Sequence, residues 1–592
     1  MSDDRAVDER IVAAVGKGAW ADFSPDRPIV QAAVLAELCL NRDPDAQPRG
    51  VRLRGLTISG DLDLEAMRAP FPIILIDCRL ELSQFLLTGA RLARLDLRGS
   101  TITTGIGALD IVVDGDVLFD STEVEGGLDL RYATIRGRLW GRNALLKNPG
   151  DVALDLEHAT VEGPVVLNSG FTAEGRVRFT AAHIGGQLNL TGATVNGDRS
   201  AIEAQGVVVG GSLFMSRDLS TQEAAHCRGE VALDGASVGG ELNCTGAVLA
   251  GPNEGRSLTA QNLRVQGNVF LNDRFRADGS VVLSGAVVGG QLNVGHACLG
   301  GPFVLDTAEI GSHLYLNDRL EALGELRLWA ATVKGNVDAR DGIFHGPVDA
   351  TGLSVGGRLD VNDARFDHRV HLVRAQAAQL ADRGTRWPAE LFLDGFEYRS
   401  IVEDQRSWQE RKELIERQGY YSAHPYRQLA AVYRAAGLDV AARQVAMASE
   451  AARAKSIRSR PRKLWLQFMR WTVGYGYQPA RIIVWAVVLV VLATLAYDHA
   501  IGRNRLLPTS EALREEVRSS RCERRYPCVN PVAYSVDVVV PIIDLHEREE
   551  WEPDRTTTEG RWVAALTWVL AGLGWLLATL LVAAVGGFIR RD

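Results

Sequence analysis

A short apolar motif, G-x-(Leu/Val)-x-(Leu/Val), recurs through the first two thirds of the chain and limits the possible folds more than any other feature. The first apolar residues of successive copies are 22 to 29 residues apart, at Leu188, Leu213, Leu242, Val269, Leu292, Leu314, Val337 and Leu359. A second apolar residue lies 11 residues before each of them, at Val177, Ile202, Val231, Leu258, Val281, Phe303, Leu326 and Val348. The half-period stays constant where the full period stretches. Insertions are therefore expected at one corner of a coil of about 22 residues.

Within each copy, apolar and polar residues alternate with a period of two, which is the pattern of a half-buried strand. Stacking such coils buries an interior ladder of aliphatic side chains, with each coil contacting only its neighbours. No coil contains an amphipathic helical segment, which excludes leucine-rich and ankyrin repeats. We therefore predict a mainly β fold, a parallel, right-handed β-solenoid of about 14 coils over residues 51–368. The Gly or Gly-Gly before each run is expected to supply the positive φ of a corner.

Both ends of the solenoid need caps, because the end coils expose strand edges. Two short helical patterns in residues 1–50 predict an N-terminal helical cap. Residues 369–462 follow the repeats, and the stretch ELFLDGFEY (390–398) predicts a last strand.

A helical hairpin is predicted after that strand. Tyr426, Leu429, Ala430 and Tyr433 have the i, i+3, i+4, i+7 spacing of one helix face, and Gly437 ends this helix. A second helix follows with its own apolar stripe. The hairpin serves either as a packed neck or as a partner-binding element, and the packed neck is favoured.

The last part of the chain has the features of a membrane anchor. Residues 463–478 mix basic and aromatic residues in the manner of an interfacial segment on an anionic surface. Two apolar stretches, 479–497 and 562–589, are each long enough to cross a bilayer. The predicted aromatic anchor at the headgroup level consists of Trp465, Trp471, Tyr475 and Tyr477.

Basic flanks before the first span and after the second predict the topology. Both termini, including the tail 590–592, and the solenoid are expected on the cytoplasmic side of the inner (plasma) membrane of a multi-pass protein. The loop 498–561 then lies outside, where oxidation is allowed. Cys522 and Cys528 in this loop are predicted to form a disulfide.

One short stretch matches a sequence motif of ion channels. Residues 472–476 read TVGYG, the letters of a potassium selectivity filter. They precede both predicted spans, so they cannot form a re-entrant loop between two spans.

A weaker channel argument concerns residues 530–553, an apolar run between the spans whose length suits a re-entrant or interfacial segment. Asp544 or His546 could then face a pore. The favoured alternative is an extracellular strand or helix over the span ends. The sequence therefore predicts that the protein reconstituted in planar bilayers carries no ion current.

The sequence contains no recognisable catalytic, cofactor-binding or metal-binding motif, and we predict no enzyme activity and no cofactor. Five cysteines (Cys39, Cys78, Cys227, Cys244 and Cys298) lack metal-ligand spacing and are expected to be buried small hydrophobic residues. The motifs LNDR and VNDAR are interpreted as coil corners, where Asn and Asp bond their own backbone. A net charge of −8 argues against a nucleic-acid partner.

The GGxLxL coils, the motif YRQLAAVYRAAGLDVAARQV and the juxtamembrane stretch YGYQP carry a resemblance over nearly the whole chain. The chain resembles actinobacterial membrane proteins with pentapeptide-repeat- or bactofilin-like solenoids, often labelled "membrane-associated oxidoreductase". The resemblance implies a membrane-anchored solenoid, and its label implies a nicotinamide or flavin site, which no motif here matches.

The function expected from the sequence is a membrane-anchored cytoplasmic scaffold or sensor that acts through protein–protein interaction. The alternative is an oligomeric ion channel or pore-forming effector gated by the solenoid. The third hypothesis is the oxidoreductase of the family label. The expected partners are the lipid bilayer, unidentified proteins and further copies of the chain.

Overall fold

The computed structural model describes residues 2–40, 49–251, 255–402, 405–456, 467, 471, 480–510, 514 and 528–585. The chain divides into two compact units, Met1–Tyr420 and Tyr421–Asp592. Each unit is described by itself.

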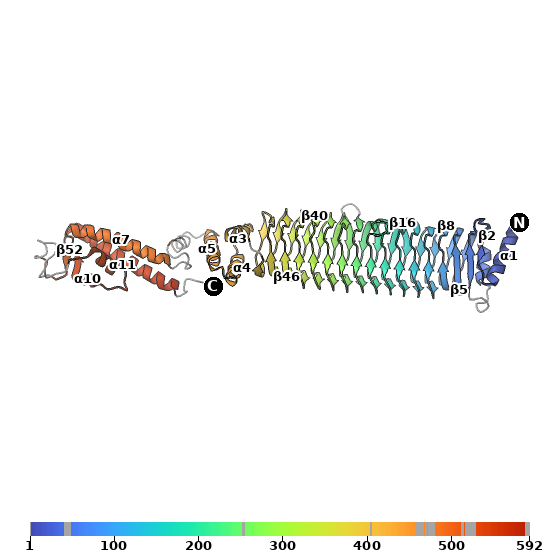
Figure 1. Cartoon of the computed structure of the whole chain (residues 1–592), viewed down its shortest axis with the longest axis horizontal. Coiled ribbons are helices and arrows are strands. Elements are labelled where there is room, and N and C mark those ends of the chain that lie inside the picture. Colours follow the sequence, from blue (N-terminus) through green and yellow to red (C-terminus); the bar gives the residue numbers. More distant parts are fainter. Residues whose placement is uncertain are drawn as a thin grey trace. The chain divides into compact units, whose positions relative to one another are not determined.

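The first unit is a parallel β-solenoid of about 16 turns (Figure 1). The predicted fold class is therefore confirmed. Its strands form one sheet of 27 strands and another of 24. The prediction of about 14 coils was too low. The sheets already begin at β1 (Ala21–Asp22) and β2 (Ile29–Gln31) and continue to β51 (Glu397–Ile401), outside the predicted range 51–368. These end coils lack the glycine motif on which the count rested. The right-handed sense stays a prediction.

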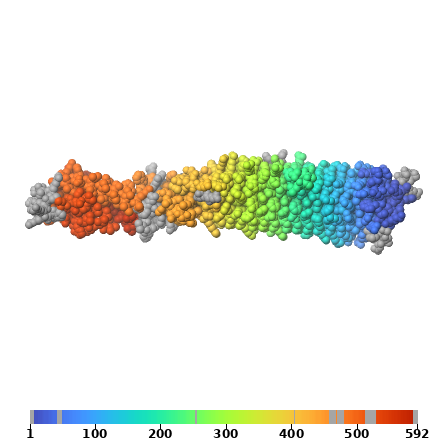
Figure 2. Space-filling view, in the orientation of Figure 1, coloured from blue at the N-terminus to red at the C-terminus, as the bar shows by residue number. Residues whose placement is uncertain are grey.

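A regular coil contains four two-residue strands. In one coil these are β34 (Val287–Val288), β35 (Leu292–Asn293), β36 (Cys298–Leu299) and β37 (Phe303–Val304). The first two belong to the 27-stranded sheet and the last two to the 24-stranded sheet. Each coil hydrogen-bonds to the next in register, and the colours of this unit accordingly change in sequence order along it (Figure 2).

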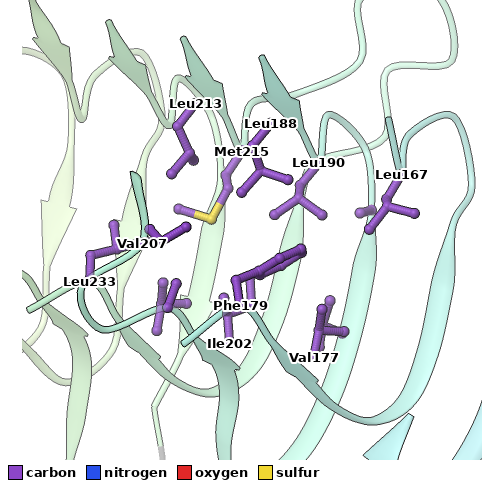
Figure 3. Close-up of a cluster of buried hydrophobic side chains, with 14 of the residues drawn as sticks. Leu167, Val177, Phe179, Leu188, Leu190, Ile202, Val207, Leu213, Met215 and Leu233 are labelled. Atoms are coloured by element: carbon purple, nitrogen blue, oxygen red, sulfur yellow. The ribbon is translucent and has the colours of Figure 1, made fainter. Parts of the chain in front are cut away.

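Both predicted ladders are confirmed residue by residue. In the 27-stranded sheet Leu188 pairs with Leu213, Leu213 with Leu242, and the series continues to Leu359. In the 24-stranded sheet Val177 pairs with Ile202 in the same way. These side chains point into the shared interior, where Phe179 and Met215 fill the space between the rows (Figure 3).

The insertions fall at two corners, not at one as predicted. Residues 215–225 lengthen the corner between β24 (Leu213–Phe214) and the 24-stranded sheet, and other insertions lie within that sheet. Four consecutive strands of the sheet run here without the usual break, namely β16 (Leu145–Asp155), β19 (Thr172–Arg178), β22 (Thr194–Glu203) and β25 (His226–Ala232). The insertions within the sheet lengthen β16 and β22. Register shifts between Lys147 and Val152 mark the place where the extra residues leave the ladder.

The positive φ predicted for the Gly-Gly pairs occurs at Gly126 (φ 91°) and Gly127 (φ 82°), but not at most of the other pairs. Positive φ occurs at other corner residues, such as Gly285 (φ 66°) and His296 (φ 56°), and Gly289 is not among them. A Cβ on Gly289 would lie 2.2 Å from the carbonyl oxygen of Gln266 in the preceding coil. Glycine is needed there because the backbones of stacked coils approach closely. The corner interpretation of the polar motifs holds, since Asp273, Asp318 and Asp363 all have positive φ.

Helices cover both ends of the solenoid. At the N-terminus α1 (Ser2–Gly16) and α2 (Ala32–Leu40) bury Ile11 and Leu35 in the same core as the coils. At the other end the predicted last strand is two strands, β50 (Leu391–Phe392) and β51, which belong to different sheets. The helix α3 (Trp408–Glu416) follows and places Leu414 in the core.

The second unit begins with the predicted helical hairpin. Its helices are α4 (Ala423–Ala435) and α5 (Asp439–Ser456). Tyr426, Leu429, Ala430 and Tyr433 are all buried, as their spacing predicted. Gly437, with φ 76°, ends the first helix.

Two further helices are long and apolar enough to cross a membrane, α7 (Ala480–Gly502) and α11 (Thr558–Val585). Both extend beyond their predicted outer ends, because the helical backbone continues into polar residues that a hydropathy pattern leaves out. Residues 586–589 of the second predicted span lie outside the described residues.

Described parts of the segment between these helices, within residues 503–510 and 528–557, are folded against them. A short antiparallel pair joins β52 (Leu506–Pro508) to β53 (Trp551–Pro553). The helices α9 (Pro531–Val539) and α10 (Glu547–Glu550) lie between them in sequence. Tyr497, Tyr534 and Trp551 belong to one buried cluster with residues of α7 and α11.

Candidate functional site

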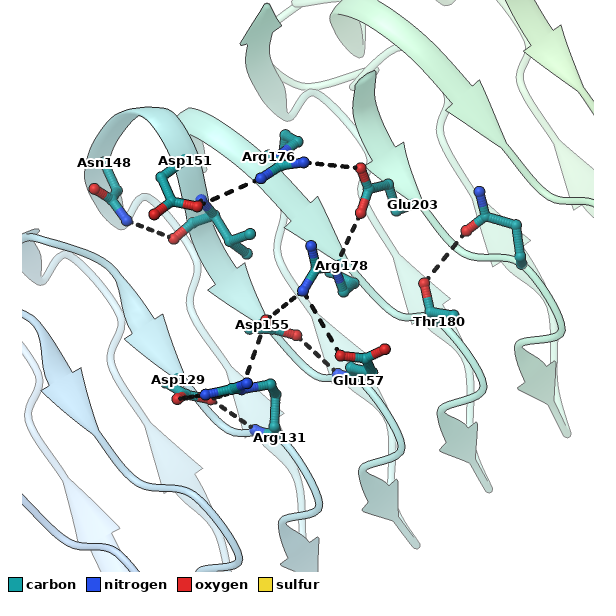
Figure 4. Close-up of polar contacts among 12 residues, drawn as sticks. Asp129, Arg131, Asn148, Asp151, Asp155, Glu157, Arg176, Arg178, Thr180 and Glu203 are labelled. Atoms are coloured by element: carbon teal, nitrogen blue, oxygen red, sulfur yellow. Dashed lines mark hydrogen bonds and ion pairs between the residues drawn. The ribbon is translucent and has the colours of Figure 1, made fainter. Parts of the chain in front are cut away.

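A row of paired charges crosses consecutive coils of the 24-stranded sheet (Figure 4). The in-register positions Asp129, Asp155, Arg178 and Glu203 stack one above the other. Arg178 bonds both of its acidic neighbours, with Nη1 2.9 Å from Asp155 and Nε 2.9 Å from Glu203. Arg131 in the adjacent turn donates to Asp129 at 2.8 Å. The pairing holds these side chains in set positions on the surface.

The middle parts of β16, β19 and β22 extend this row into a shallow groove. Arg176 links Glu203 at 3.3 Å to Asp151 at 3.4 Å. The groove is lined by residues of the three neighbouring strands β16, β19 and β22, namely Gly150, Asp151, Gly175, Arg176, Gly197, Asp198, Arg199, Ser200 and Glu203. Asp198 and Arg199 are exposed, so both signs of charge face a potential ligand. We call this row and its groove the charged groove.

Burial changes the electrostatics at the centre of the row. It raises the pKa of Asp155, and the backbone N–H of Glu157 and the guanidinium of Arg178 act in the opposite direction. The arrangement suits recognition of a partner with charges of both signs. Among the described residues, no group of three His, Cys, Asp or Glu side chains could hold a metal ion.

Another hollow lies between α4 and α5 on the hairpin. It is lined by residues of both helices and of the turn before them, Tyr421, Ala423, Tyr426, Arg427, Ala430, Ala431, Arg434, Ala446, Ser449, Glu450 and Arg453. This hollow is a second surface on which a partner could dock, in keeping with the less favoured role of the hairpin.

The predicted cysteines fall into two classes. Cys39, Cys78, Cys227 and Cys244 are buried in the solenoid, as expected, whereas Cys298 is only half-buried. Cys528 is disulfide-bonded. Its predicted partner Cys522 lies outside the described residues, so the pairing itself stays a prediction.

Only one of the predicted anchor residues is described. Trp471 is 69% exposed, and its carbonyl accepts a hydrogen bond of 3.2 Å from the indole of Trp485 in α7. Trp465, Tyr475, Tyr477 and the whole TVGYG stretch lie outside the described residues. Their role as an aromatic anchor stays a prediction.

The helix α9 packs against both long helices. The ring of Tyr534 meets that of Tyr497 in α7 edge-on, with centroids 4.8 Å apart. The hydroxyl of Tyr497 in turn lies 2.9 Å from that of Thr567 in α11. Ser535, Val538 and Val539 are buried as well. The helix is therefore held by a continuous set of contacts between the two long helices.

The candidate pore residues follow α9. Asp544 and His546 lie side by side, with the imidazole Nδ1 3.7 Å from the carboxylate, and both side chains are about two-thirds exposed. Sequence reasoning missed Asp537, which is buried and accepts backbone N–H bonds from Leu545 at 3.2 Å and Arg548 at 3.0 Å. The sequence did contain a signal for this residue, since Asp537 is an acidic residue within the apolar run of residues 530–553.

Comparison with known proteins adds no relative: no family model, no curated protein and no solved structure matches this chain. The family resemblance drawn from the motifs thus stays a prediction.

Proposed function

We propose that this chain is a membrane-attached sensor or scaffold whose solenoid binds a protein partner through the charged groove. The solenoid lies in the cytoplasm, and both chain termini are on that side of the plasma membrane. The observation that carries the proposal is the set of ion pairs that holds Arg176, Arg178 and Glu203 in one geometry across neighbouring coils.

Preorganised charges favour specific recognition, because little side-chain freedom is lost when a partner binds. Complementary charges also speed encounter and reject wrong partners. Stability alone is a weak reason for such a row. The exposed pair of Arg176 with Asp151 contributes little, and the desolvation of the buried Asp155 offsets much of the gain from its pair with Arg178. The repeat architecture suits the same role, since stacked coils form an extended and rigid surface.

Two helices long and apolar enough to cross a membrane support the attachment. Their side chains are largely exposed outside the cluster with α9, among them Val487 at 57% and Trp568 at 74%. Exposed apolar residues over this length require lipid or further protein around them.

The test is photo-crosslinking in cells, with a photoreactive residue placed at Arg199 in the charged groove. The matched control is Arg264, which is exposed on β30 (Arg264–Val265) of the other sheet. A discrete protein adduct at position 199 and none at 264 is expected. Adducts at neither position, or equally at both, would contradict the proposal.

A further inference from the structure

The C-terminal end of α9 lies at the middle of α11. A Cβ on Gly574 would be 2.0 Å from the carbonyl oxygen of Val539, so the missing side chain admits the end of α9. Gly574 is 16 residues beyond Thr558, the first residue of the 28-residue helix α11. At 1.5 Å per residue this is about 24 Å along the helix. If α11 crosses a bilayer, α9 descends to its midplane.

The first turn of α9 lies near one end of the two long helices, because its Tyr534 contacts Tyr497, five residues before the end of α7. The helix α9 begins after Asn530, whose side chain accepts a hydrogen bond of 3.0 Å from a backbone N–H of that first turn. The outer end of the two long helices carries charged residues, with Arg505 2.9 Å from Glu559. The helix therefore enters from the polar end of the unit and stops within the apolar layer.

The chain then turns without helical structure over residues 540–546, until α10 begins. The carboxylate of Asp537 holds the turn by accepting the N–H groups of Leu545 and Arg548. In this segment Ile542 is 81% exposed, and the side chain of Asp544 is 68% exposed. Non-helical backbone and an acid at membrane depth are tolerated only inside protein or beside water.

Contrary to the expectation from the sequence, which was no ion current, we propose that several copies of this chain assemble around residues 540–546, and that Asp544 of each copy lines a water-filled path for cations. Two spans cannot enclose such a path, and a closed ring of copies is the simplest arrangement that can. This inference rests on the proposed membrane attachment but not on any partner of the charged groove.

The charges of the segment favour cations. Asp544 is its one acidic residue, and the segment contains no Lys or Arg. The carbonyl end of α9 points to the same depth and carries the negative pole of the helix dipole. A ring of such groups attracts cations and repels anions.

The first test measures water access in the full-length protein in membranes, through reaction with a charged, membrane-impermeant thiol reagent. Asp544→Cys is compared with Val491→Cys, which is exposed at the middle of α7, and wild-type protein supplies the background. Position 544 is expected to react about tenfold faster, because only a hydrated thiol forms the reactive thiolate. Equally slow reaction at both positions would overturn the proposal.

The second test measures current from purified protein in planar bilayers with asymmetric potassium chloride. Wild-type protein is expected to show a cation-selective reversal potential, which Asp544→Asn shifts towards zero. Asp498→Asn, which removes an exposed acid of α7, should leave it unchanged. No current, or the same shift in both variants, would overturn the cation path. Neither result depends on the crosslinking at Arg199, so the two proposals can fail separately.

Discussion

Arg411 of α3 and Asp382 at the end of β49 (Gln376–Ala381) form a two-bond ion pair that closes the C-terminal end of the solenoid. The two hydrogen bonds measure 2.9 and 2.8 Å, and the side chains are only 6% and 3% exposed. The indole of Trp387 also donates to Asp382 at 3.3 Å. The pair thus links the capping helix to the last coils through a buried charge.

Asp382→Ala should destabilise this end by about 3–5 kcal/mol, because it leaves the guanidinium of Arg411 buried without its carboxylate. The measurement is hydrogen exchange over residues 376–420 in the full-length protein. Asp367→Ala is the control, since it breaks only partly exposed contacts, with Arg365 and His345, each worth at most about 1 kcal/mol. Equal loss of protection in the two variants would contradict the role given to Asp382.

Gly239→Ala should lower the denaturation midpoint of the solenoid, at a cost of about 1–3 kcal/mol. The new Cβ would lie 2.2 Å from the carbonyl oxygen of Gly210, so the two coils must separate. Gly235→Asn is the control, because this corner has open space and a φ of 66° that Asn adopts readily. The midpoints are measured by circular dichroism in urea. An equal fall of the midpoint in both variants would show that close approach of the coils is not the reason for glycine at position 239.

The buried cysteines of the solenoid should resist thiol reagents at pH 8. Burial raises the pKa of Cys227 to about 12 and that of Cys78 to about 11. These folded-state pKa values exceed those of the unfolded chain. The stability that the neutral thiols contribute is therefore complete below about pH 8.5 and is lost as the pH rises towards the folded values. Labelling is measured by mass spectrometry, with a denatured sample for comparison. Rapid labelling of either residue in the native protein would contradict the predicted resistance to thiol reagents.

Labelling from outside intact cells should modify Arg555→Cys and spare Arg264→Cys. Arg555 is exposed in the turn before α11, and Arg264 is exposed on the solenoid. The result follows from the predicted topology, in which basic flanks keep the solenoid in the cytoplasm. Protection of position 264 that disappears when the cells are permeabilised is the internal control. Modification of position 264 in intact cells would contradict the predicted topology, because it would place the solenoid outside the cell.

Purified protein should show no flavin absorbance and no saturable nicotinamide binding at micromolar concentration, because no motif of the chain matches either site. The measurements are an absorbance spectrum and a titration followed by intrinsic fluorescence. A bound flavin in stoichiometric amount would favour the oxidoreductase hypothesis over the scaffold or sensor.

The sequence alone determined those parts of the fold that repeat locally. Period-two alternation placed Leu188 and Val177 in the interior, and the constant half-period placed their partners in adjacent coils. Helical spacing identified the buried face of α4, and apolar length identified the two long helices. In each case a side chain's environment depends on residues close to it in sequence, so a pattern is sufficient.

Tertiary structure decided what depends on contacts between distant residues. The end coils lack the glycine motif and join the solenoid only because neighbouring strands offer free hydrogen-bonding edges. The pairing of Asp382 with Arg411 spans 29 residues, and neither residue's surroundings in the sequence indicate burial. The contact between Val539 and Gly574 arises because a missing side chain on one helix admits the end of another. Such fits depend on shape in three dimensions, which no period in the sequence records.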